Sequence, residues 1–145
     1  MILMQTLLNQ LKMKDALLFH SVTLTEAQAI SISLVKAGFI RIPRGYLRFL
    51  SFSDGLAWNG VELFACIPHE RAGTVFNQPD LLEYQTKYAR GRFFAHRLIL
   101  GRALESLICY DADNKCYELL NRDTLNTMLK FPRFEDMLYY LIFEK

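Results

Sequence analysis

Three side chains that could do chemistry together stand within five positions of one another, in the stretch FACIPHERAG. Cys66, His69 and Glu70 offer a thiol, an imidazole and a carboxylate, the groups from which cysteine hydrolases build a nucleophile and its base. In such enzymes the cysteine and the histidine meet in space rather than in sequence. No papain-like or caspase-like signature surrounds Cys66. The stretch therefore favours a strand cysteine followed by a polar surface loop, and a cysteine hydrolase using Cys66 and His69 is the alternative.

The sequence predicts neither a metal site nor a cofactor. Its three histidines are far apart, and it has no H-E-x-x-H motif and no glycine-rich phosphate loop. The stretch DADNK, at 111–115, is similar to the start of a calcium loop, but Cys116 and Arg122 stand where that loop needs glycine and glutamate. A tight hairpin turn explains the stretch better.

Composition limits the class of protein. The chain has 145 residues, of which 52% are hydrophobic, so we expect one folded domain over 1–145. A net charge of +2 is too weak to indicate a face for nucleic acid. Three cysteines without C-x-x-C predict neither a disulfide framework nor a zinc site. The N-terminus lacks the basic region of a signal peptide, and no stretch is long enough to span a membrane, so we expect a cytoplasmic protein.

Hydrophobic spacing predicts an α+β fold in which helices flank one antiparallel sheet. Thr23 and Glu26 fit a capping box, and Pro43 suits the first position of a third helix. The predicted helices cover residues 2–19, 23–38, 43–55, 79–93 and 133–145. They comprise N-terminal helices, a middle helix and a C-terminal helix.

The predicted sheet has about five to six strands. Asn59-Gly60 is a strong hairpin signal, and the residues after it alternate as a strand would until Pro68. The predicted strands that follow this turn cover residues 61–67, 96–102, 106–111, 115–120 and 127–131.

One segment resembles a known family. It reads I-P-x-x-Y-x-x-F-L-x-x-x-D-G, and a tryptophan and a strand follow. The pattern resembles that of the SUKH superfamily of Smi/Knr-like proteins, with the YrhA-like bacterial branch closest, over the chain from about Thr23 to its end. The residues at its pattern positions are Pro43, Tyr46, Phe49, Leu50, Asp54 and Gly55, with Asp54 standing where family members typically have asparagine and Ile42 where they have leucine. We expect all six to serve the scaffold rather than any chemistry.

The resemblance implies a non-enzymatic, protein-binding function. Bacterial SUKH proteins are often immunity proteins of toxin–antitoxin pairs, which neutralise a cognate toxin by direct binding. We expect a protein partner, with no nucleic acid and no membrane. Candidate contacts are Trp58 and the loop residues His69, Glu70 and Arg71. An intracellular regulatory or scaffold protein of the same fold is an alternative.

Overall fold

The computed structural model describes residues 3–70 and 77–144, and its centre is one antiparallel sheet of seven strands. The strand order is β1-β2-β3-β6-β7-β8-β9, so neighbours in the sheet follow one another in the chain except where β3 meets β6. The strands are β1 (Leu17–Leu18), β2 (Leu56–Trp58), β3 (Val61–Leu63), β6 (Arg97–Arg102), β7 (Ser106–Asp111), β8 (Cys116–Asn121) and β9 (Thr127–Phe131). The predicted α+β class is confirmed, and the sheet has slightly more strands than predicted.

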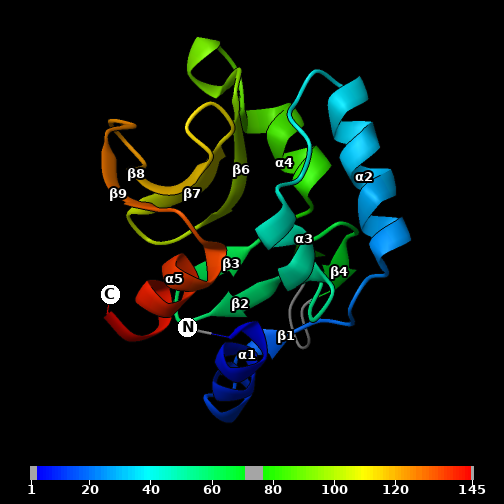
Figure 1. Cartoon of the computed structure of the whole chain (residues 1–145), viewed down its shortest axis with the longest axis vertical. Coiled ribbons are helices and arrows are strands. Elements are labelled where there is room, and N and C mark those ends of the chain that lie inside the picture. The colour runs from blue at the N-terminus through cyan, green and yellow to red at the C-terminus, as the bar shows by residue number, and fades with distance from the viewer. Residues whose placement is uncertain (1–2, 71–76, 145) are drawn as a thin grey trace.

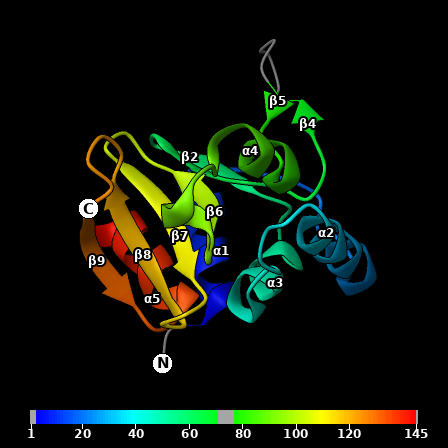
Figure 2. The same ribbon diagram turned by 90° about the horizontal axis from the view of Figure 1, so that it is seen from above.

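In the described part of the chain, five α-helices pack around this sheet: α1 (Met4–Met13), α2 (Leu24–Lys36), α3 (Arg44–Leu50), α4 (Leu81–Tyr88) and α5 (Phe134–Tyr139). Figure 1 shows α2, α3 and α4 gathered on one side of the molecule, with β7, β8 and β9 on the other. Figure 2 shows α1 and α5 behind the strands β7 to β9. The main core fills the space between these helices and the sheet. Among the described residues, every helix is too short or too polar to cross a bilayer.

Local sequence signals account for several element boundaries. The capping box of α2 is present, because Thr23 accepts a hydrogen bond from the Glu26 N–H and Glu26 accepts one from the Thr23 N–H. Asn59 and Gly60 have φ values of 48° and 81°, as the tight turn between β2 and β3 requires. These two predictions are confirmed.

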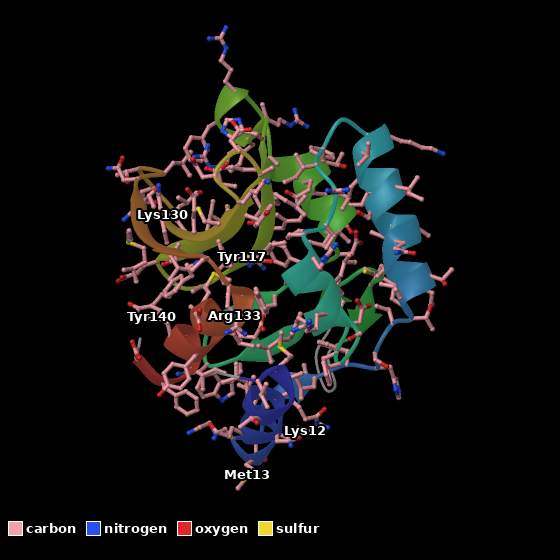
Figure 3. The ribbon with its side chains drawn as sticks, viewed as in Figure 1. Lys12, Met13, Tyr117, Lys130, Arg133 and Tyr140 are labelled. Carbon is pink, nitrogen blue, oxygen red and sulfur yellow. The ribbon has the colours of Figure 1, made fainter. Side chains whose placement is uncertain are left out.

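Three predicted segments are shorter in the structure. The first helix ends at Met13 rather than at residue 19, because Asp15 adopts a φ of 61° and the following residues pair with β2 as β1. The figure with side chains shows Met13 at the outer tip of α1 (Figure 3). The third helix stops at Leu50, and Pro43 is its N-cap rather than its first residue. The middle helix ends at Tyr88 because Gly91 turns the chain with a φ of 90°.

The predicted strand over residues 61–67 is also too long, because β3 leaves its partner after Leu63. The Phe64 N–H still donates to the Leu100 carbonyl, but Ala65 then pairs in a single parallel bridge with Asp80. At Ile99 the strand β6 therefore pairs with β7 on one side and has no strand partner on the side of β3 among the described residues.

A buried glutamine takes the place of the missing strand. The Gln85 side chain, fully buried in α4, donates to the Ile99 carbonyl at 2.7 Å and accepts from the Ile99 N–H at 2.8 Å. It thereby pairs both backbone groups of Ile99, as a strand residue would. This arrangement fixes α4 against the sheet.

Replacing Gln85 with leucine will destabilise the fold by roughly 2–4 kcal/mol, because it leaves two buried backbone groups unpaired. Urea unfolding monitored by circular dichroism measures the loss. The matched control is Gln28→Leu on α2, where the glutamine is exposed and the expected change is below about 0.5 kcal/mol. Equal stability of the two variants would contradict the role assigned to Gln85.

Candidate functional site

Cys66 lies in a structural junction rather than beside an activating base. The residue is 4% exposed, and its backbone N–H donates to Asp54 Oδ1 at 2.7 Å. The Ile67 N–H donates to the other Asp54 oxygen at 3.3 Å. Burial, followed by the negative charge of Asp54, raises the pKa of the Cys66 thiol to about 12. A cysteine nucleophile needs the opposite shift, because the thiolate is the reactive form.

The raised pKa predicts that Cys66 will react very slowly with iodoacetamide in the folded protein. Relative to a thiol with the ordinary pKa of 9.0, the thiolate fraction at pH 8 falls about 1,000-fold. Mass spectrometry of the Cys66 peptide, labelled in the native and in the denatured chain, measures the ratio. Equal labelling rates in the two states would contradict this environment for the thiol.

The predicted contact residues lie in different parts of the fold. His69 and Glu70 form the strand β4 (His69–Glu70), which pairs with β5 (Asn77–Gln78) in a two-stranded ribbon, so the backbone here is a strand and not the predicted loop. The antiparallel pairing of these two short segments gives an extended backbone where the sequence predicted a loop. Arg71 lies outside the described residues.

Trp58 faces the main core from the end of β2. It is half-buried and pairs with Val61, which is buried in the same core. Glu62, one residue further along, alternates to the opposite face of the sheet. Trp58 therefore lies on the other face of the sheet from the ion pair of Glu62.

The six residues of the resemblance pattern form one junction between α3 and the sheet. Tyr46, Phe49 and Leu50 are fully buried. The Tyr46 hydroxyl donates to the Phe64 carbonyl and lies 3.2 Å from the Leu100 carbonyl oxygen, which joins α3 to both sides of the β3–β6 gap. Pro43 caps α3, Asp54 holds the backbone at Cys66 and Ile67, and Gly55 turns the chain with a φ of 103°.

Gly45, inside the same pattern, allows a close approach from the sheet. Tyr117 lies in the middle of the molecule between β8 and α3 (Figure 3). A Cβ atom on Gly45 would stand only 2.5 Å from the Tyr117 hydroxyl oxygen. Close packing of Tyr117 on α3 therefore explains a glycine in the first turn of this helix.

A pocket of about 310 Å³ opens beside α4, at the base of the β4–β5 ribbon. We call it the α4 pocket, and its lining residues are Pro68, Pro79, Glu83, Tyr84, Lys87, Tyr88 and Arg102. The rings of Phe64, Tyr84 and Tyr88 stack in a row, with centroid separations of 4.2 and 4.6 Å. The row begins in the core at Phe64 and ends at Tyr88, which is 58% exposed. Aromatic and arginine side chains at a pocket mouth are typical of residues that dominate protein–protein binding.

Charged residues of both signs surround the α4 pocket. The Arg102 guanidinium lies 5.6 Å from the Tyr84 ring centroid and bonds Glu62 at 3.3–3.4 Å. Lys87 bonds Glu83 at 2.8 Å, four residues earlier on α4. The hydrogen bond and charge of Lys87 hold the pKa of Glu83 below its usual value.

The sequence contained only part of this site. Tyr84 and Tyr88 are four residues apart in a predicted helix, a spacing that places two side chains on one helix face. That spacing could have indicated an aromatic face. Arg102 reaches the pocket only through the pairing of β3 with β6, for which no local signal exists.

Two clusters of metal-binding residue types occur in the described part of the chain: His96 with Asp111 and Asp113, and Asp111 with Cys116 and Glu118. Arg97 supplies a cation to both buried carboxylates, with its Nε 3.0 Å from Glu118 and its Nη2 3.6 Å from Asp111. A metal ion would have to compete with this guanidinium. The geometry therefore describes an internal ion-pair network.

Burial alone would raise the pKa of Asp111. Hydrogen bonds from the Asn114 side chain and from the backbone of Asn114 and Asp113 outweigh it, together with the charge of Arg97, and hold the pKa below its usual range. The same bonds close the turn between β7 and β8, so the calcium-like letters DADNK form the predicted hairpin turn.

No protein-family model matches the chain, and no curated protein matches its sequence.

Proposed function

We propose that the chain is a non-enzymatic, protein-binding domain of the SUKH type, an immunity protein that neutralises a cognate bacterial toxin by direct binding. The observation that carries the proposal is the shared position of the six pattern residues. All of them serve the junction of α3 with the sheet. A sequence pattern whose every member has a structural role in one junction is what a scaffold motif requires.

The α4 pocket supports the binding part of the proposal. Tyr84, Tyr88 and Arg102 belong to the residue types that contribute most to binding energy at interfaces. They stand on a helix and a sheet strand, so the surface is formed before a partner arrives and binding costs little ordering. A standard interface covers about 800 Å² on each partner, so the pocket would form its centre and neighbouring residues its rim.

The environment of Cys66 disfavours the alternative of a cysteine hydrolase. Its thiol is buried and its pKa is raised rather than lowered. A regulatory or scaffold protein of the same fold would use the same kind of surface, and only the partner would differ.

Co-expression with the product of the neighbouring gene tests the proposal. We expect a one-to-one complex by affinity purification and light scattering, and rescue of growth when that product is toxic. Tyr88→Ala should weaken the complex about tenfold, since it removes the exposed ring of the α4 pocket. Tyr139→Ala, at an exposed tyrosine on α5, is the matched control and should leave affinity unchanged.

Different outcomes separate the three functions. Failure to form a complex and to rescue growth would refute the immunity function. A complex that forms while the toxin stays active would favour the regulatory or scaffold protein. Loss of rescue in Cys66→Ala, with the complex and the fold intact, would favour the hydrolase.

A further inference from the structure

We propose that the α4 pocket receives an acidic side chain next to an aromatic one, both from the partner protein. The inference rests on the proposed protein-binding function and adds the chemistry of the contact. Three observations carry it: an arginine whose Nη1 makes no hydrogen bond to the described residues, the charged residues of the pocket, and an aromatic row that ends at the surface.

Arg102 has hydrogen-bonding capacity left. Its Nε and Nη2 atoms share the Glu62 carboxylate through three bonds of 3.3–3.4 Å, longer than the 2.7 Å of Arg133 to Glu135. Among the hydrogen bonds of the described residues, none uses its Nη1 atom. The side chain is 31% exposed and lines the pocket. A second carboxylate can therefore bind Nη1, in the planar geometry that a guanidinium offers.

The charges of the lining favour an anion over a cation. Lys87 and Arg102 both line the pocket, whereas Glu83 is the sole acidic residue of the described lining. Glu83 is already held by Lys87 at 2.8 Å. Both cations are paired, Lys87 with Glu83 and Arg102 with Glu62, but Arg102 keeps its Nη1 donor for a carboxylate. An incoming ammonium group meets no acidic residue of the described lining except the paired Glu83.

The row of aromatic rings formed by Phe64, Tyr84 and Tyr88 favours an aromatic side chain next to the carboxylate of the partner. Tyr84 is the one ring that contacts Tyr88 among the described residues, and it lies on the inner side of the row. The exposed surface of Tyr88 can take a further ring at the spacing already present within the row, 4.2–4.6 Å. Pro68 and Pro79 add rigid apolar walls. A partner protein with an acidic residue next to an aromatic one fits both the Nη1 donor of Arg102 and the exposed surface of Tyr88.

The test uses the full chain, labelled with ¹⁵N, and two capped dipeptides. Acetyl-Asp-Phe-amide and acetyl-Asn-Phe-amide differ only in the charge of the first side chain. We expect the acidic dipeptide to shift the amide resonances of α4 and the Arg102 Nε–Hε resonance, and to bind about tenfold more tightly than its neutral counterpart. Arg102→Gln should remove this preference, whereas Arg44→Gln, at an exposed arginine at the start of α3, should retain it.

Tyr88→Ala provides a variant that does not depend on the Arg102 ion pair, since the ring is largely exposed. It should weaken both dipeptides by a similar factor and keep the preference for the acidic one. Equal binding of the two dipeptides, or the absence of shifts on α4, would overturn the inference. Tighter binding of a deoxythymidine oligonucleotide at the same resonances would overturn it in favour of a phosphate backbone.

Failure of this inference differs from failure of the proposed function. A toxin complex that survives Arg102→Gln unchanged, with no dipeptide preference, refutes the acidic contact and leaves the immunity function standing. Absence of any toxin complex, with the dipeptide preference intact, refutes the immunity function and leaves the chemistry of the pocket standing.

Discussion

Replacing Arg97 with methionine will destabilise the protein by about 3–5 kcal/mol, because it leaves two buried carboxylates without their cation. Glu118 is 1% exposed and Asp111 is fully buried, and both lie within 3.6 Å of the guanidinium. Arg97 also donates to the Phe93 carbonyl at 2.9 Å and lies 4.1 Å from the centroid of its ring. Methionine retains the apolar stem and removes the charge, so urea unfolding at pH 7 measures mainly the electrostatic loss.

Two controls sharpen this experiment. Arg92→Met, at an exposed arginine of the short 3-10 helix Arg92–Phe94, should change stability by less than about 0.5 kcal/mol. The double variant Arg97→Met with Glu118→Leu should recover part of the loss, because it removes one orphaned charge. A single Arg97→Met variant as stable as Arg92→Met would show that the network contributes nothing.

The network also gives the wild-type protein a defined response to acid. Because the folded pKa of Asp111 lies below its unfolded value, its contribution is fully present above about pH 3.9 and is lost as the pH falls through the folded value. In Arg97→Met, Asp111 has lost the charge of Arg97, one of the causes that lower its pKa, so less of this contribution exists to be lost in acid. The difference in stability between the two proteins should therefore narrow as the pH falls below about 3.9.

Replacing Gly101 with alanine will cost about 3 kcal/mol, the upper end of the usual range for overpacking. An added Cβ would overlap the backbone carbonyl oxygen of Glu62 and lie 3.0 Å from Leu63 Cδ2. A backbone atom cannot rotate away as a side chain can, so β3 must move off β6. Thermal unfolding and urea unfolding both measure the loss.

Gly38→Ala is the matched control for this substitution. Gly38 has a φ of 95° and open space around it, so alanine there adds backbone strain of about 1 kcal/mol and no overlap. If Gly101→Ala were no less stable than Gly38→Ala, close packing of β3 on β6 would not be the reason for a glycine at this position.

Local features of the fold could be predicted from the sequence because each depends on neighbouring residues. The Thr23 capping box, the Asn59-Gly60 turn and the DADNK hairpin are all closed by groups a few residues apart. The strands β7 and β9 were predicted with their observed bounds for the same reason, since turns and alternation mark both ends.

The features that could not be predicted join distant parts of the chain. In the sequence, Gln85 is an ordinary polar residue of a predicted helix. Its role depends on β3 ending before Ile99, which leaves the Ile99 N–H and carbonyl to be bonded by the Gln85 side chain. Gly101 looks like an isolated glycine, and its role depends on Glu62 across the sheet. In the α4 pocket, the spacing of Tyr84 and Tyr88 indicates a shared helix face, but no local sequence signal indicates that Arg102 lies beside them.

The pairing of β3 with β6, like that of β1 with β2, has a cost in chain entropy because it joins residues far apart in the chain. Pairing Glu62 with Arg102 closes a loop of 40 residues, whereas pairing Asp111 with Cys116 closes one of five. Three doublings of loop length cost about 1.8 kcal/mol. Three sets of contacts offset this cost. Gln85 bonds the backbone of Ile99, the Tyr46 hydroxyl contacts the Phe64 and Leu100 carbonyls, and the Arg102 guanidinium packs on the Tyr84 ring. A partner that bridges α4 and Arg102 would therefore stabilise one of the two strand pairings that close the longest loops in the described sheet. Its binding would stabilise the whole domain by an amount set by the free partner concentration relative to the dissociation constant.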